Sequence, residues 1–521
     1  MNRSFPESCR TEKPFRRSGR QSEDDMRYLL TSEQMKTCDR TEIEHYGVPS
    51  VVLMERAALA VRDVILNRYP DVSDILVICG SGNNGGDGFA VARLLNMAGR
   101  RAEVLFVGKH DHMTQETALQ AEIFSRHGGT VLPDESGVKG YGLIVDALFG
   151  IGLCREVIGR YADLIHAVNR SDTPVLAVDI PSGISADDGH VLGCAVKADI
   201  TVTMAFAKLG LVLYPGAEYC GEVIVADIGI TAAGLKDEPV TALEITDLGG
   251  LLPARRRTAN KGTYGRLLLI AGTRNMAGAA CLAAEAAYRT GCGLVCVYSH
   301  EENRVILQTS VPEAIFTPWT DELARWLDWA DAVAIGPGLG QSEESLGLLT
   351  QVLRDWTGPL VIDADALNLM ASHPELKPES GAPAIITPHP GEMSRLLNAG
   401  IEEEQVSVST IVSSPVSTAF EYACRSGFVT VLKGARTVVA DNEETYLNLT
   451  GNEGMATGGS GDTLTGIIGS LLAQGMLPME AAKTGVLLHG AAGDAAAADL
   501  GTRSIIAGDL SDYIPQVLEE I

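Results

Sequence analysis

The sequence predicts an α/β protein with two domains, each built around a mostly parallel sheet. Short apolar segments typical of β-strands alternate with helical segments along most of the chain. Twice, a glycine-rich turn follows such a strand or opens a helix. Hydrophobic residues make up 45% of the 521 residues, aromatic residues only 5%, and glycine occurs 56 times, which suits an α/β protein with many tight loops. This length accommodates two large domains.

Charge and cysteine usage narrow the classes of function. The 41 basic and 67 acidic side chains give a net charge of −26, so we expect neither nucleic acid nor a membrane as a partner. An anionic small molecule remains compatible, because a helix N-terminus supplies local positive potential. No apolar run is long enough to span a membrane. The ten cysteines lack a C-x-x-C motif, which favours reduced thiols and a cytoplasmic location over disulfides or zinc.

The first 25 residues differ in composition from the rest of the chain. They combine six basic and five acidic side chains without apolar periodicity. They also lack the apolar segment of a secretory signal. We expect residues 1–25 to form a disordered extension and Met26 to be the functional beginning.

The first predicted domain covers residues 26–235. Residues 30–69 have a helical pattern, in which Thr31 or Ser32 caps one helix and Pro49 opens a second. A short strand at 75–79 then leads into the glycine loop, a helix and another strand. Further strand segments are GLIVDALFG, PVLAVDIPSG, ITVTMAF and EVIVADIGI.

The second predicted domain covers residues 236–521. Turn formers and the basic cluster at 255–257 mark the junction between the domains. A strand at 266–272 precedes a helix rich in small residues at 277–290. The strand segments LVCVYS, DAVAIGPGLG, PLVIDAD, AIITPHPGE and FVTVLKG follow, and the last part of the chain, from GGSGDTLTG onward, is helical.

The first glycine loop, GSGNNGGDG at 80–88, has the composition of a ligand-binding turn. Glycines permit positive φ angles and a close approach of the backbone to a phosphate, and the following helix N-terminus favours an anion. Asn83, Asn84 and Asp87 add oxygens that suit a ribose or a monovalent cation. A turn that is merely glycine-rich is the simpler alternative, but five glycines with these three polar residues favour ligand binding.

Two further strand ends carry carboxylates, Asp146 and Asp179. Each carboxylate alone could be a turn or helix cap. In an open parallel sheet, however, ligands bind beyond the carboxyl ends of the strands. We therefore expect these two loops to converge with the glycine loop on one site.

The motifs VICGSGNNGGDGFAVARLL, VDALFGIG and VDIPSG resemble the epimerase domain of the bifunctional NAD(P)H-hydrate repair enzymes. This resemblance implies a Rossmann-like three-layer α/β/α fold and binding of a hydrated dinucleotide. It implies a potassium site at Asn84, Asp146 and Ser182, and Asp179 as the proton-transfer group of the epimerisation. The implied substrate contacts are Asn83, Asn84, Gly85, Gly86, Asp87, Gly150, Ile151, Gly152, Leu153, Cys154, Arg155, Glu156 and Asp179.

A second site is predicted at GGSGDTLTG, residues 458–466. The glycine N–H groups can form an anion hole for a transferring phosphoryl group, and Asp462 is placed to accept a proton from an attacking hydroxyl. The simpler alternative is an aspartate that caps a helix. Lys433 and Arg436 can neutralise phosphates, although they could also be a solvated pair. His389 lies at a strand end between two prolines, a setting that favours ligand contact.

Five motifs in order, KGTYGRLLLIAG, GPGLG, ITPHPGE, LKG and MATGGSGDTLTG, resemble the ADP- or ATP-dependent NAD(P)H-hydrate dehydratases of the ribokinase-like superfamily. The resemblance implies a ribokinase-like α/β fold for the second domain. It implies Mg²⁺ with ADP or ATP, and Asp462 as the catalytic base. The implied hydrate contacts are Ala279, Gly338, His389 and Asp462, and the implied nucleotide contacts are Lys433, Gly434, Ala435, Arg436, Thr437 and Gly461.

Together the resemblances imply an enzyme that epimerises and dehydrates hydrated NADH and NADPH, and we expect it to be a homo-oligomer. One alternative is a vitamin or sugar kinase of the ribokinase-like superfamily with an appended nucleotide-sensing domain. Another is that the first domain is a non-catalytic sensor or partner-binding module. A dehydrogenase is disfavoured because the first loop has no G-x-G-x-x-G run.

Overall fold

The computed structural model describes residues 15–18, 28–133, 137–378, 381–401 and 405–521. The chain divides into two compact units between Thr241 and Ala242, a few residues after the junction expected from the sequence. Of the segment expected to be a disordered extension, only Phe15–Ser18 is described. These residues form β1, a strand that we did not predict, and the remainder lies outside the described residues.

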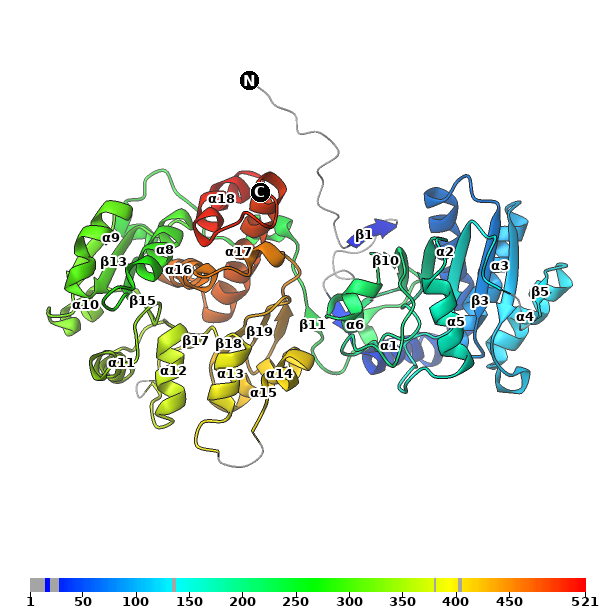
Figure 1. Cartoon of the computed structure of the whole chain (residues 1–521), viewed down its shortest axis with the longest axis horizontal. Helices are drawn as coiled ribbons and strands as arrows, with labels where there is room; N and C mark the ends of the chain where they lie inside the picture. The colour runs from blue at the N-terminus through cyan, green and yellow to red at the C-terminus, as the bar shows by residue number, and fades with distance from the viewer. Residues whose placement is uncertain (1–14, 19–27, 134–136, 379–380, 402–404) are drawn as a thin grey trace, which may run out of the picture. The chain divides into compact units, whose positions relative to one another are not determined.

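The first unit is a parallel sheet in the strand order β1-β10-β8-β7-β6-β3-β4-β5 (Figure 1). All of its strand pairs are parallel, as predicted. Its strands after β1 are β3 (Asp74–Cys79), β4 (Arg101–Phe106), β5 (Val131–Leu132), β6 (Leu143–Ala147), β7 (Val175–Val178), β8 (Ile200–Met204) and β10 (Glu222–Ala226). The short strands β2 (Tyr28–Leu30), β9 (Ala207–Lys208) and β11 (Val240–Thr241) are not part of this sheet. Strand β2 pairs with both β9 and β11.

Helices cover both faces of this sheet. They are α1 (Ser32–Glu44), α2 (Ser50–Arg68), α3 (Asn83–Met97), α4 (Gln115–Arg126), α5 (Arg160–Asn169) and α6 (Leu209–Val212). Alternate strand residues point to opposite faces. Ile75 and Val77 of β3 therefore pack with α2 and α3, whereas Leu76 and Ile78 pack on the face covered by α5. This alternation confirms the predicted three-layer α/β/α arrangement.

The first helix begins where the sequence predicts. Thr31 accepts a hydrogen bond from the Gln34 N–H, and the Gln34 side chain accepts one from the Thr31 N–H, which completes a capping box. Such a cap contributes about 1 kcal/mol. It fixes the start of α1, a helix that lines part of a cavity.

The second unit has strands in the order β14-β13-β12-β15-β16-β17-β18-β19-β20. The strands from β14 to β18 pair in parallel, and the last two pair antiparallel. Their bounds are β12 (Arg266–Ile270), β13 (Leu294–Ser299), β14 (Ile315–Pro318), β15 (Ala332–Ile335), β16 (Leu360–Ile362), β17 (Ala384–Ile386), β18 (Val429–Leu432), β19 (Val438–Ala440) and β20 (Thr445–Leu447).

Helices also flank both faces of the second sheet, with α8, α16 and α17 on one side and α11, α12, α13 and α15 on the other (Figure 1). The bounds are α7 (Leu248–Leu251), α8 (Ala277–Arg289), α9 (Arg304–Ser310), α10 (Leu323–Trp329), α11 (Glu343–Asp355), α12 (Ala364–Ser372), α13 (Pro390–Leu397), α14 (Val408–Ser413), α15 (Pro415–Ser426), α16 (Ser460–Ala473), α17 (Pro478–Leu500) and α18 (Ala507–Glu519). The predicted α/β class therefore holds for both units.

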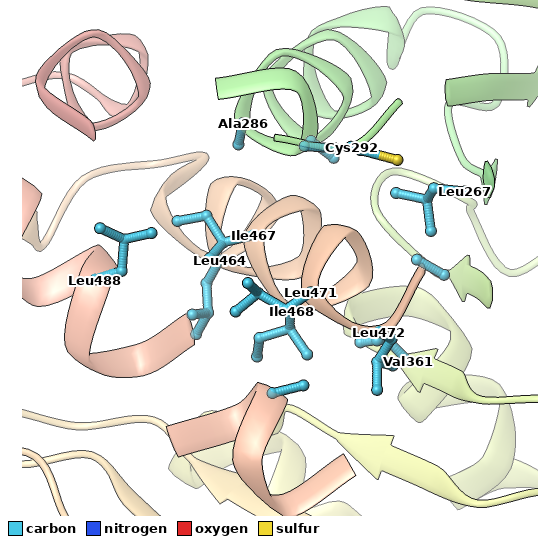
Figure 2. Packing of buried hydrophobic residues seen from close by; sticks show 14 of the residues in the cluster. Leu267, Ala286, Cys292, Val361, Leu464, Ile467, Ile468, Leu471, Leu472 and Leu488 are labelled. Atoms are coloured by element: carbon cyan, nitrogen blue, oxygen red, sulfur yellow. The ribbon is translucent and has the colours of Figure 1, made fainter. Parts of the chain in front are cut away.

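Helix α16 is the centre of the second core (Figure 2). Leu464, Ile467, Ile468 and Leu471 are almost completely buried among residues of α8, α17 and the sheet. Burial of each such side chain contributes about 1.5–3 kcal/mol. At Gly466 a Cβ would lie only 2.0 Å from the Ala283 carbonyl oxygen, so glycine is required for this close approach to α8. The packing holds the N-terminus of α16 in a fixed place.

Two further expectations concern the chain as a whole. Within the described ranges, no helix combines the length and the apolar character needed to cross a membrane. The nine cysteines described by the structure, which exclude Cys9, are all free thiols.

Candidate active sites

The first glycine loop joins β3 to α3. Gly80 packs so tightly that a Cβ there would lie 2.0 Å from the Leu148 carbonyl oxygen. Helix α3 begins at Asn83 after Gly82. The N–H groups of Gly85 and Gly86 donate to the Gly82 carbonyl, whereas those of Asn83 and Asn84 have no acceptor within the helix. The loop therefore presents amide donors and the positive end of a helix dipole at the carboxyl edge of the sheet.

A cavity of about 970 Å³ lies at this edge of the first unit. The structure brings most of the predicted substrate contacts to its wall. Asn83, Asn84, Asp87, Gly150, Ile151, Gly152, Leu153, Cys154, Arg155 and Asp179 line the cavity.

Gly85, Gly86 and Glu156, also predicted as contacts, are not among the lining residues. A Cβ at Gly85 would lie 1.9 Å from the Gly80 carbonyl oxygen, and one at Gly86 would meet Met54 and Thr117 within 3 Å. The close packing thus requires glycine at both positions, whether or not a ligand binds. The Glu156 side chain is exposed.

The three residues expected to bind potassium lie together. The Ser182 hydroxyl donates to the Asp146 carboxylate at 2.7 Å, and the Asn84 amide donates to the Phe149 carbonyl at 3.0 Å. The Phe149 N–H in turn donates to Ser182 Oγ at 2.8 Å. All three side chains are more than nine-tenths buried. The sequence prediction that these strand-end loops converge is therefore correct in geometry.

The donor set suits a monovalent cation. Asp146 is only 1% exposed, and its hydrogen-bond partners in the structure are the neutral donors Leu148 N–H, Ser182 N–H and Ser182 Oγ–H. Burial raises the pKa of Asp146, while these hydrogen bonds oppose the rise. A buried carboxylate surrounded by neutral oxygens and amides lacks a positive counter-charge, which a potassium ion would provide.

Asp179 is held by a lysine that sequence reasoning missed. Lys208 Nζ lies 2.6 Å from Asp179 Oδ1 and also donates to Thr203 Oγ1 at 2.8 Å and to the Met204 carbonyl at 2.9 Å. Lys208 is completely buried, and the Asp179 side chain is 14% exposed. Asp179 also has a positive φ of 69°, which is rare for a residue with a Cβ and is found preferentially at functional sites.

Other missed residues reach the cavity from elements distant in sequence. Met35, Lys36 and Asp39 come from α1, and Glu116 comes from α4. No local motif marks them, because their positions depend on how the helices pack over the sheet edge. The only available signal was the helical periodicity of the segments, which predicts a buried face but not a pocket.

In the second unit, Asp462 lies in the first turn of α16. Gly459, which precedes the helix, has a φ of +96°, a conformation that favours glycine. Burial and the charge of Asp363 raise the pKa of Asp462 to about 7, and Lys433 opposes the rise. At neutral pH a substantial fraction of Asp462 is thus deprotonated and able to accept a proton.

Lys433 forms an ion pair that the sequence did not suggest. Its Nζ lies 2.8 Å from Asp363 Oδ1 and 4.0 Å from Glu392 Oε2. Thr465 of α16 donates to the other Asp363 oxygen at 2.7 Å. Burial raises the pKa of Asp363, but Lys433 and these hydrogen bonds lower it more, so that its pKa lies below the usual value. Asp363 thereby couples Lys433 to the helix that carries Asp462.

His389 caps α13. Its Nδ1 accepts hydrogen bonds from the N–H groups of Gly391 at 3.0 Å and Glu392 at 3.4 Å. Burial lowers the pKa of His389, and Lys433 and Arg395 lower it further. The imidazole is therefore neutral at physiological pH, with Nε2 on its other edge.

The remaining predicted residues are two of the hydrate contacts and five of the nucleotide contacts. A Cβ at Gly338 would lie 3.0 Å from the Ala279 Cβ, so these two predicted hydrate contacts are neighbours. A Cβ at Gly461 would lie 3.2 Å from Lys433 Nζ, which brings the glycine turn beside the lysine. Gly434, Ala435, Arg436 and Thr437 form the turn between β18 and β19, where Gly434 and Ala435 are exposed.

His489 of α17 was also missed. Its Nε2 lies 3.0 Å from the Ser460 carbonyl oxygen, at the start of α16. Burial lowers the pKa of His489 to about 4, and the hydrogen bond to Ser460 opposes this change. The neutral imidazole of His489 thus contacts the backbone of the glycine turn at the start of α16.

These features define a two-domain α/β enzyme, with a cavity at the carboxyl edge of the first sheet and a cluster of charged side chains at that of the second. Residues 267–516 match the family model described as NAD(P)H-hydrate dehydratase, and residues 50–210 match the model described as YjeF-related protein N-terminus.

Whole-chain relatives agree with these two matches. The bifunctional NAD(P)H-hydrate repair enzyme of Moorella thermoacetica is 38% identical over 95% of this chain and 97% of its own length. The corresponding enzyme of Coxiella burnetii is 39% identical over 94% of this chain and 99% of its own, and that of Escherichia coli is 38% identical over 94% and 93%. The chain belongs to the family of bifunctional NAD(P)H-hydrate repair enzymes.

Among solved structures, the ADP/ATP-dependent NAD(P)H-hydrate dehydratase from Bacillus subtilis, co-crystallized with ATP/Mg²⁺, is 33% identical. It covers 55% of this chain and 99% of its own, with a TM-score of 0.49.

Proposed function

We propose that this chain repairs hydrated NADH and NADPH in two steps. The first unit interconverts the R and S epimers of the hydrate. The second unit dehydrates the S epimer at the expense of ADP or ATP, giving NAD(P)H, phosphate and AMP or ADP. The observation that carries the proposal is Asp462, a carboxyl group with a pKa of about 7 in a glycine-led helix turn beside Lys433, in a chain of the repair-enzyme family.

The chemistry explains why a kinase-type site can perform a dehydration. The hydrate carries a hydroxyl on C6, next to the ring nitrogen, and hydroxide is a poor leaving group. Asp462 takes the proton of this hydroxyl, and the C6 oxygen attacks the terminal phosphoryl group of the nucleotide. The ring nitrogen then expels phosphate, and loss of a C5 proton restores the dihydronicotinamide.

The residues around Asp462 have matching roles. We assign Gly461 and the preceding glycine amides to the phosphoryl group in transfer, and Lys433 to its negative charge. The turn from Gly434 to Thr437 is assigned to the nucleotide, and Ala279, Gly338 and His389 to the hydrate. Mg²⁺ accompanies the nucleotide phosphates and neutralises part of their charge.

The cavity of the first unit is assigned to the hydrated dinucleotide. The amides at the start of α3 suit its phosphates, and Asp179 is the proton-transfer group. Asn84, Asp146 and Ser182 would hold a potassium ion, which would supply a positive charge next to the buried Asp146. The assignment of Gly85, Gly86 and Glu156 as further substrate contacts stays a prediction.

The test is incubation with a mixture of both hydrate epimers and either ADP or ATP. We expect NADH and free phosphate to appear together until both epimers are consumed. A vitamin or sugar kinase would instead leave a stable phosphorylated product and release no phosphate. Replacing K⁺ by Na⁺ should slow use of the R epimer and leave the S epimer unaffected.

We also propose a cytoplasmic location and assembly into a homo-oligomer. Nine free thiols among the described residues support a reducing compartment. The particle mass in solution, measured by sedimentation, tests the assembly.

A further inference from the structure

Two carboxyl groups face the cavity of the first unit in opposite electrostatic surroundings. Asp87 extends from the second turn of α3, and Asp179 follows β7. Both line the same cavity, and the charge of Asp179 raises the pKa of Asp87. Enzymes commonly divide acid and base roles between two carboxyl groups whose environments differ in this way.

The surroundings of Asp179 are hydrogen-bond donors, one of which is a buried lysine. Its Oδ1 receives hydrogen bonds from Lys208 Nζ at 2.6 Å, Thr203 Oγ1 at 3.2 Å and the Met204 N–H at 3.2 Å. The Lys208 ammonium is completely buried, so its charge is poorly screened by water. Donors converging on one oxygen also fix the direction of the group.

The surroundings of Asp87 favour the protonated form. In the described part of the chain, Asp87 has neither an ion pair nor a side-chain hydrogen bond to another protein group. Burial raises the pKa of Asp87 well above its usual value, and the charges of Asp179 and Asp39 raise it further. The group therefore keeps a proton that it can donate into the cavity.

We propose that Asp87 is the proton donor and Asp179 the proton acceptor of the epimerisation, which proceeds by exchange of the C6 hydroxyl with water. This inference rests on the epimerase function proposed above. It changes the role of Asp87 from a substrate contact to a catalytic residue, and it makes Lys208 the positioning residue of the base.

The proposed step balances as follows. Asp87 donates its proton to the C6 hydroxyl, the C6–O bond breaks, and water leaves. The electron pair of the ring nitrogen forms a double bond to C6. A second water molecule attacks C6 from the other face, its electron pair forms the new C6–O bond, and the nitrogen recovers its pair. Asp179 takes the proton of this water, and proton exchange with solvent then returns Asp179 and Asp87 to their starting forms. One epimer is thus converted to the other with one water released and one consumed, and no net change in protons.

Several other titratable groups face this part of the cavity. Asp39 comes from α1, and Cys79 at the end of β3 interacts with Asp87. Burial raises the pKa of both Asp39 and Cys79. The other charged or titratable lining groups are Lys36, Lys109, His112, Glu116, Cys154, Arg155, Tyr161 and Lys208. The pH dependence must therefore be assigned with variants and not from the wild-type profile alone.

The first experiment compares full-length Asp87→Asn, Asp87→Glu and the wild type on the pure R epimer, with S-epimer dehydration as the internal measure of an intact second unit. We expect Asp87→Asn to lower kcat for the R epimer by about 10²-fold or more, the size of a general-acid contribution. The loss of activity of the wild type at high pH should disappear in Asp87→Asn, and Asp87→Glu should restore part of the rate. Asp163→Asn, an exposed carboxyl of α5, is the matched control and should behave as the wild type.

A rate for Asp87→Asn within about threefold of the wild type overturns the assignment, as does a raised KM with unchanged kcat. If Asp87→Asn fails to fold, a second measurement on the wild type decides. Epimerisation in ¹⁸O-labelled water should place one ¹⁸O on C6 for each inversion, and inversion without label overturns the proposed exchange. A wild type that does not accelerate R-epimer conversion above the spontaneous rate would refute the epimerase function itself, a different result from either failure.

Discussion

At the scale of single residues, the two sites depend on carboxyl groups whose charge is set by their neighbours. Asp179 Oδ1 lies 2.6 Å from Nζ of the buried Lys208, whereas burial raises the pKa of Asp462 to about 7. The sequence predicted both aspartates, because each follows a strand or a glycine turn at a sheet edge. It could not predict Lys208 or Asp363, because only the three-dimensional fold brings these partners to the predicted residues.

The first prediction concerns Asp462. Because we propose its carboxylate as the base, the dehydration rate should increase with pH up to about pH 7 and level off above this value. Asp462→Asn should lower the rate on the S epimer by about 10²–10⁴-fold and remove this dependence, while epimerisation remains. Asp328→Asn, an exposed carboxyl of α10, is the control. Near-normal NADH formation by Asp462→Asn would contradict the base role.

At the scale of elements, α16 connects core packing to catalysis. Its apolar residues fill the space between α8, α17 and the sheet (Figure 2). Its first turn carries Asp462. Helix α16 could be predicted from GGSGDTLTG, but the burial of all its residues after Asp462 could not, because the small residues of α8 that permit close contact form no ligand motif. Most elements of the first unit could also be predicted, but β1 could not, nor could the part of the cavity wall that α1 and α4 supply.

A core substitution tests this connection. Leu471 is completely buried, so Leu471→Ala should lower the free energy of unfolding by about 2–5 kcal/mol, measured by urea denaturation. Leu471→Met, which preserves volume, should cost less than about 1.5 kcal/mol. The alanine variant should lose dehydration before epimerisation as urea increases. A loss below about 0.5 kcal/mol, the range of surface substitutions, would show that α16 is not held by this packing.

At the scale of the whole molecule, one chain carries two sites on two separately packed units. Each site lies where strands of a parallel sheet end and a glycine turn opens a helix, the position at which α/β folds bind ligands. The fold class and this placement followed from the sequence, because alternating strands and helices with glycine turns admit few other arrangements. The epimerisation and the dehydration that we propose use no residue in common. Each unit should therefore keep its activity when the catalytic group of the other is replaced.

Complementation between two full-length variants tests this claim most directly. Asp179→Ala should lack epimerisation and Asp462→Asn should lack dehydration, so neither alone should convert the pure R epimer to NADH above the spontaneous rate. A mixture of the two variants with ADP or ATP should restore NADH and phosphate formation, with the S epimer as the diffusing intermediate. If the mixture stays inactive although Asp179→Ala still dehydrates the S epimer, the division of labour between the two units is wrong.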